Sequence, residues 1–112
     1  MSSLIQVPSI SSFSWTNGSD EYFSDSGQEI SGSTDLGDGN DKITINESHI
    51  GIWIEESGQL YAWLGDDHIQ VNSLSGTTGI GISGLLSMGT GNDTVQSNGT
   101  WNKGIIVYGA LD

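Results

Sequence analysis

Cysteine is absent from this sequence of 112 residues, which excludes disulfide bridges, thiolate metal sites and cysteine nucleophiles. Arginine is absent too, and the basic residues are two lysines, Lys42 and Lys103. Because no basic patch can form, we expect no binding to nucleic acid. The sequence has a single proline and a hydrophobic content of 34%, so a conventional core would be thin.

Long apolar runs are also lacking. No stretch approaches the length of a transmembrane helix, so no membrane span is expected. Residues 1–8 have neither a basic start nor a long apolar segment, and they do not resemble a secretory signal peptide.

Acidic residues and glycine are plentiful. Fourteen Asp and Glu residues stand against two basic residues, which gives a formal net charge of −12, and there are 17 glycines. The acidity could serve only to keep the protein soluble. Because the carboxylates are concentrated in glycine turns, a metal-binding role is favoured instead.

One segment shows this concentration best, with the sequence DLGDGNDKITI at residues 35–45. Gly37 and Gly39 allow backbone conformations that are closed to residues with a Cβ atom. Asp38, Asn40 and Asp41 place oxygen ligands in the same turn, which suits a hard cation such as calcium. The residues that follow, ITI, alternate in polarity and predict a short half-buried strand.

The same turn recurs along the chain. The segment MGTGNDTV at residues 88–95 repeats it closely, and LGDDHIQV at residues 64–71 is interpreted as a copy that lacks two turn residues. The last aspartate of each turn falls at 41, 67 and 93, a spacing of 26 residues both times. NGSDEY at residues 17–22 is a fainter copy. A fixed period in this range predicts a solenoid of stacked repeats.

These turns resemble the hemolysin-type, or RTX, calcium-binding repeat, Gly-Gly-x-Gly-x-Asp-x-(aliphatic)-x. GNDKI at residues 39–43 and GNDTV at residues 91–95 match the second half of that pattern, while its first glycine is replaced by Leu36, Leu64 and Met88. The resemblance covers roughly the last two-thirds of the chain. In the family the repeats follow every nine residues, whereas here one turn occurs per period and a second segment fills the rest.

The resemblance implies a calcium-binding structural module of a secreted or cell-surface protein, one that folds when calcium is bound after export. Asp41 and Asp93 would be side-chain ligands, and Gly37, Gly39, Gly89 and Gly91 would form the turns. Asp67 is expected to be a poorer ligand because its turn is interpreted as shortened, and Asp66 could take its place. Asp20 is expected to be a weaker ligand than Asp67. The candidate calcium ligands are Asp38, Asn40, Asp41, Asp66, Asp67, Asn92 and Asp93.

The predicted fold is all-β: a right-handed parallel β-solenoid of about four coils over residues 17–112, each coil having three short strands and three turns. Residues 1–16 would form an N-terminal edge strand or a cap. Stacking places equivalent residues above one another in ladders. The two expected interior ladders are Ile43, Ile69 and Val95, and Ile52, Ile80 and Ile105.

Stacking would also place Asp41, Asp67 and Asp93 in a column of carboxylates. Two such charges about 5 Å apart repel by roughly 3 kcal/mol at an effective dielectric constant near 20. Cations between the coils would turn that repulsion into binding. The alternative is that these aspartates only cap turns through bonds from side chain to backbone.

The sequence is also compatible with functions that need no metal. Tyr61 and Trp63 share a strand face and, with Trp53 and Trp101, could bind sugars, which would make the chain a metal-free module for adhesion or for an extracellular glycan or surface partner. A fragment of a β-helix polysaccharide-acting enzyme is a further alternative. With few basic residues, and with Glu55 and Glu56 pointing opposite ways along a strand, catalysis is not expected.

The C-terminus raises a separate expectation. The chain stops shortly before the next turn of the period would begin, which would leave Ile105, Val107 and Leu111 uncovered at an open coil. We therefore expect either a fragment of a longer repeat protein or self-association through the C-terminal coil.

Overall fold

The computed structural model describes residues 9–46, 50–107 and 109–111, with side chains described outside 73–77, 99–107 and 110–111. These residues are all-β and contain no helix, which confirms the predicted class. No helix that could span a membrane is present in them. The strands are β1 (Glu21–Ser24), β2 (Gln28–Ile30), β3 (Ser33–Asp35), β4 (Lys42–Asn46), β5 (Ile50–Ile54), β6 (Gln59–Tyr61), β7 (His68–Ile82), β8 (Leu85–Ser87), β9 (Thr94–Val107) and β10 (Ala110–Leu111).

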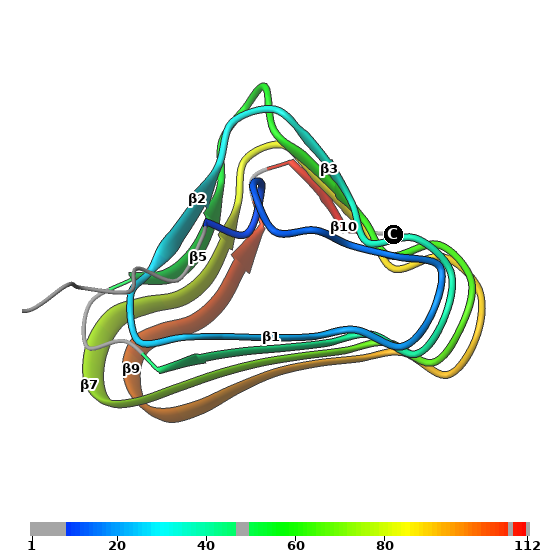
Figure 1. Ribbon diagram of the computed structural model, residues 1–112. Coiled ribbons are helices and arrows are strands. Elements are labelled where there is room, and N and C mark those ends of the chain that lie inside the picture. The colour runs from blue at the N-terminus through cyan, green and yellow to red at the C-terminus, as the bar shows by residue number, and fades with distance from the viewer. Residues whose placement is uncertain (1–8, 47–49, 108, 112) are drawn as a thin grey trace, which may run out of the picture.

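The strands pair in parallel throughout the described residues and form three sets. β1, β4 and the first parts of β7 and β9 make one set, and β2, β5 and the later parts of β7 and β9 make the second. β3, β6, β8 and β10 make the third. Figure 1 shows these sets as three sides of a triangular outline, with successive passes of the chain lying over one another.

The strand register places like residues side by side. Ile43 pairs with Ile69, which pairs with Val95, so the first predicted ladder is confirmed. Ile52 pairs with Ile80, which pairs with Ile105. Ile43, Ile69, Ile52 and Ile80 are fully buried. Alternating strand residues thus fill the interior in layers, which compensates for the low content of apolar residues.

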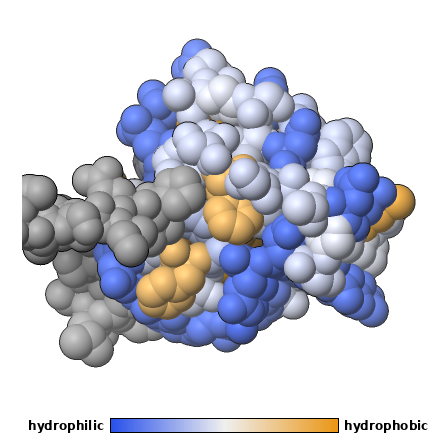
Figure 2. All heavy atoms as spheres, viewed as in Figure 1, coloured by the Kyte–Doolittle hydropathy of each residue, from blue (hydrophilic) through white to orange (hydrophobic). Residues whose placement is uncertain are grey.

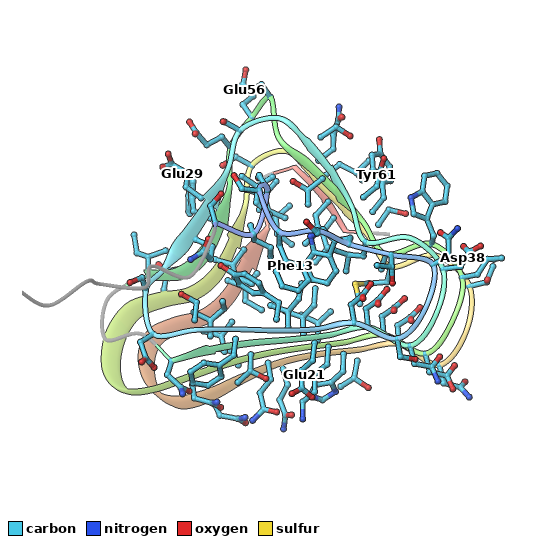
Figure 3. The ribbon with its side chains drawn as sticks, viewed as in Figure 1. Phe13, Glu21, Glu29, Asp38, Glu56 and Tyr61 are labelled. Atoms are coloured by element: carbon cyan, nitrogen blue, oxygen red, sulfur yellow. The ribbon has the colours of Figure 1, made fainter. Side chains whose placement is uncertain are left out.

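Residues 9–16 contain no strand, and hydrogen bonds from Ile10 to Gln28 and between Ser11 and Thr34 hold them over the first layer (Figure 1). Ile10 is fully buried, and its carbonyl accepts a hydrogen bond from Trp15 Nε1 at 3.0 Å. Phe13 packs edge-on against Tyr22, with ring centroids 5.3 Å apart, and Figure 3 shows Phe13 inside the outline. The N-terminal layer is therefore covered by an apolar and aromatic cluster.

At the other end, β9 pairs with β7 alone and β10 with β8 alone among the described strands. The predicted self-association through this end rests on the side chains of Ile105, Val107 and Leu111, which lie outside those described. It stays a prediction.

The middle turn is not shortened, so that interpretation of the sequence was wrong. Leu64 forms a β-bridge with Thr90, which makes Gly65 the equivalent of Gly91. Gly39, Gly65 and Gly91 have φ of +100°, +115° and +110°. Ala62, not Leu64, therefore takes the position of Leu36 and Met88, and all three are buried. The similarity of LGD at 36–38 and 64–66 favours an alignment of Leu36 with Leu64. The backbone register instead aligns the buried apolar residues, Leu36 with Ala62.

This register puts Trp63 where the other two turns have Gly37 and Gly89. Trp63 has φ of +64°, beside +81° and +75° for those glycines, and no other non-glycine residue among those described has positive φ. A left-handed conformation at a residue with a Cβ atom costs on the order of 1–3 kcal/mol. The first and third turns thus have glycine at this left-handed position, and the middle turn has tryptophan instead.

The stacked turn glycines leave no room for side chains. A Cβ atom on Gly65 would lie 2.3 Å from the carbonyl oxygen of Gly39, and one on Gly91 would lie 2.2 Å from that of Gly65. Close approach of successive turns therefore depends on glycine in this column.

We predict that Gly65→Ala lowers the free energy of unfolding by about 2–4 kcal/mol, because it adds backbone strain and a steric clash. Gly32→Ala is the matched control, since a Cβ atom there would meet nothing within 4 Å. Its effect should be within about 0.5 kcal/mol. Urea unfolding of both variants measures the difference, and equal stabilities would contradict the close stacking of the turns.

Candidate metal site: the aspartate column

Four aspartates each lie one residue before a strand in the four layers, and we call them the aspartate column. They are Asp20, Asp41, Asp67 and Asp93, which precede β1, β4, β7 and β9. The backbone N–H of each of the first three donates to the Oδ1 atom of the next: Asp20 to Asp41, Asp41 to Asp67 and Asp67 to Asp93, each at 2.9 Å. The column that the period predicts is therefore present. Asp20, the weakest candidate from sequence, is part of it through its backbone.

The two central carboxyl groups are buried, with Asp41 exposed to 2% and Asp67 to 1%. Their Oδ1 atoms accept the hydrogen bonds above, but their buried Oδ2 atoms have no hydrogen-bond partner. A buried polar atom without a partner costs free energy, and the cost is larger when the group is charged. The alternative role for these aspartates is to cap neighbouring turns. Capping explains the hydrogen bonds of the Oδ1 atoms, but it does not explain why the Oδ2 atoms are buried without a partner.

Burial raises the pKa of Asp41 and of Asp67 from 3.8 to about 6. The backbone hydrogen bonds from Asp20 and Asp41, respectively, lower the pKa and so oppose this shift. Neighbouring carboxylates add to it, and for Asp67 these include both Asp41 and Asp93. With a pKa of about 6, both groups are still largely ionised at pH 7. Protonation therefore does not remove the buried charge at that pH.

A second ladder lies on the exposed side of the same turns. Asn40 Oδ1 accepts the N–H of Asp66 at 2.8 Å, and Asp66 Oδ1 accepts the N–H of Asn92 at 2.8 Å. Asp66 and Asp67 thus belong to different ladders, and Asp66 lies outside the aspartate column. The two ladders also run in opposite directions, because Asp66 donates to the preceding layer and Asp67 to the following one.

The seven predicted ligands are therefore not brought together at one point. Asp41, Asp67 and Asp93 belong to the aspartate column, where Asp41 and Asp67 are buried and Asp93 is half-buried, while Asn40, Asp66 and Asn92 form the exposed ladder. Asp38 belongs to neither, and Figure 3 shows it on the outside of the corner. Within the described part of the chain, no three His, Cys, Asp or Glu side chains form a group that could hold a metal ion by themselves. A cation in the column would need backbone oxygens in addition.

His68, which follows Asp67, contacts Gln70 Oε1 at 3.2 Å through Nε2. Gln70 in turn donates to Asn72, and Asn72 lies in a ladder with Asn46 and Asn98. This histidine therefore belongs to a polar network on the outer face of the sheet.

Comparison of the chain with protein-family models, with curated protein sequences and with solved structures finds no match. The functional conclusion therefore depends on the geometry of the aspartate column.

We predict that, without divalent cations, the free energy of unfolding falls as the pH rises from about 4 to 7. The pKa of Asp41 and Asp67 is raised to about 6 in the folded chain, so the folded state binds these protons more tightly than the unfolded state does. Their stabilising contribution is complete below the unfolded pKa of 3.8 and is lost as the pH passes 6.

Urea unfolding in chelator at a series of pH values measures this slope. Asp67→Asn keeps an oxygen acceptor for the Asp41 N–H but cannot ionise, and it should flatten the slope. Asp25→Asn changes an exposed carboxylate and should leave it unchanged. A wild-type stability that rises with pH over this range would show that the buried charges are not costly.

Proposed function

We propose that this chain is a right-handed parallel β-solenoid whose aspartate column binds calcium, and that it serves as a calcium-dependent structural module of a secreted or cell-surface protein. The observation that carries this proposal is the pair of buried, unpartnered Oδ2 atoms on Asp41 and Asp67.

The solenoid part of the proposal is supported by the parallel pairing. Turn residues 26 positions apart are hydrogen-bonded to each other at Asp41 and Asp67, and again at Asp67 and Asp93. Every described strand pair is between one pass of the chain and the next. Parallel strands in one sheet are joined by right-handed crossovers in nearly all proteins, which favours the right-handed form.

The ligand chemistry favours calcium. The column supplies carboxylate oxygens without sulfur or imidazole, and hard cations prefer such donors. Asp41, Asp67 and Asp93 would hold the ions through their carboxylates, with carbonyl oxygens of the glycine turns completing the coordination. Calcium accepts irregular sets of six to eight oxygens, whereas magnesium demands a near-ideal octahedron. An elongated column of side chains and backbone suits the former.

Calcium would supply stability that the thin core does not. The chain carries a net charge of −12, and its most deeply buried carboxylates repel one another. Binding of a cation to the folded state alone adds stability in proportion to the logarithm of its concentration. Folding would therefore follow export into a calcium-rich medium, which agrees with the location implied by the RTX resemblance.

We predict that the effect of Asp67→Asn on stability, relative to the wild type, changes sign when calcium is added. In chelator at pH 7 the variant should be at least as stable as the wild type, because it removes a buried charge. In calcium at a hundredfold excess over the dissociation constant, the wild type should gain about 2.7 kcal/mol and the variant much less. Thermal unfolding followed by far-UV circular dichroism measures both conditions.

Asp66→Asn is the matched control, since it makes the same chemical change in the exposed ladder and should keep the calcium response. Because Asp67 lies between two other carboxylates, we expect that replacing Asp67 weakens calcium affinity at least as much as replacing Asp93 does. This order is the opposite of the one that a shortened turn implied. An unchanged spectrum and unfolding temperature with and without calcium would rule out the proposed function.

A further inference from the structure

Trp63 is unusual among the tryptophans whose side chains are described. Trp15 packs in the N-terminal cluster, and Trp53 lies over Gly81, where a Cβ atom would come within 2.2 Å of its ring. Trp63 by contrast is 47% exposed, on the outside of the corner turn. It neither fills the core nor covers an end of the structure, although it occupies a left-handed position that glycine would adopt without steric strain.

The indole ring is held in place by stacking. Its ring lies against that of Tyr61 with centroids 5.3 Å apart and planes inclined by 21°. Figure 3 shows Tyr61 on the outer side of the outline, close to the corner that carries Asp38. The two aromatic rings therefore form one nearly parallel stack on the surface, and Trp63, the more exposed of the two, offers the outer face of this stack as an aromatic platform.

The residues in register with Tyr61 and Trp63 in the layers above and below are small or polar. Gly37 and Gly89, which flank Trp63 in the neighbouring turns, have no side chains. Two residues earlier in the chain, at the end of β6, Tyr61 lies between Asp35 and Ser87. A carboxylate and a hydroxyl group are thus placed beside the aromatic rings, where they can accept or donate hydrogen bonds.

We propose that Tyr61 and Trp63 form a binding site for a neutral carbohydrate. A pyranose ring presents C–H groups on one face and hydroxyl groups around its rim. The exposed aromatic platform would cover the C–H face, and Asp35 and Ser87 would bond to hydroxyl groups. The amphipathic rings of Trp and Tyr suit a ligand of this mixed character.

Charge and shape argue against other ligands. The net charge of −12 and the nearby carboxylates of Asp35 and Asp38 would repel an anionic ligand. A cage for a quaternary ammonium group surrounds the cation with rings at steep angles. The rings of Tyr61 and Trp63 are instead nearly parallel.

A protein partner is also disfavoured, because a stable interface buries about 800 Å² on each side. Among the described residues, the large apolar side chains that are exposed are Phe23, Ile50, Trp63 and Leu64. On the face shown in Figure 2, the strongly hydrophobic residues occupy small areas among hydrophilic and neutral ones.

Calorimetry and tryptophan fluorescence with a panel of neutral hexasaccharides of glucose, mannose, xylose and galactose test this site, with a basic hexapeptide and choline as separate arms. Wild type, Trp63→Gly and Trp53→Phe are compared in the same calcium buffer, so the comparison does not depend on where calcium binds. Trp63→Gly installs the residue that the equivalent turns already have, and its circular dichroism should match that of the wild type.

At least one neutral hexasaccharide should bind the wild type and Trp53→Phe, and Trp63→Gly should bind it at least about tenfold more weakly. Failure of every member of the panel to bind would overturn the proposal. Equal binding of the sugar by Trp63→Gly and by the wild type would overturn it as well. So would a Trp63→Gly variant that loses binding of the peptide or of choline while its binding of every sugar is unchanged.

Discussion

The hydrogen bond from each turn aspartate N–H to the carboxylate of the next layer is the interaction on which this structure depends most. It sets the register of the strands that follow, because Asp41, Asp67 and Asp93 directly precede β4, β7 and β9. The buried isoleucine ladders begin two residues later, at Ile43 and Ile69. A shift of one residue would turn those side chains out of the interior. Packing of the core is thus coupled to a stack of negative charges.

That coupling creates the problem which a cation would solve. One oxygen of each buried carboxylate is used in the register bond, and the other has no partner at Asp41 and Asp67. The carboxylates that accept the register bonds are the same groups that carry the charges. The charges therefore cannot move apart unless those hydrogen bonds break. Amide side chains could make the register bond without charge, as Asn40 does in the exposed ladder. Aspartate rather than asparagine at positions 41 and 67 is what a metal-binding role would require.

Much of this arrangement could be predicted from the sequence, and particular residues show why the rest could not. The period of 26 residues was sufficient to align Ile43 with Ile69 and Asp41 with Asp67. It could not distinguish the two ladders, because Asp66 and Asp67 are adjacent and chemically identical. The identity of the buried apolar position in the middle turn was also missed. Ala62 gives a weaker signal than Leu64, although only Ala62 lies in the interior.

Two features of the structure reduce stability, and both are connected with proposed functions. Trp63 adopts a left-handed backbone conformation at a position that suits glycine, and the buried Oδ2 atoms leave charge without a partner. Natural proteins depart from the most stable local choice mainly at functional sites. Phe13 and Trp15 show the contrasting case, since they are aromatic residues that close the N-terminal layer by packing against Tyr22.

Anomalous diffraction from crystals grown with calcium tests the central claim most directly, because it locates bound ions without reference to stability. The account predicts anomalous peaks within the aspartate column, in contact with Oδ2 of Asp41 and of Asp67. Peaks confined to exposed carboxylates such as Asp38 and Asp66, with both Oδ2 atoms still free of any ion, would contradict it.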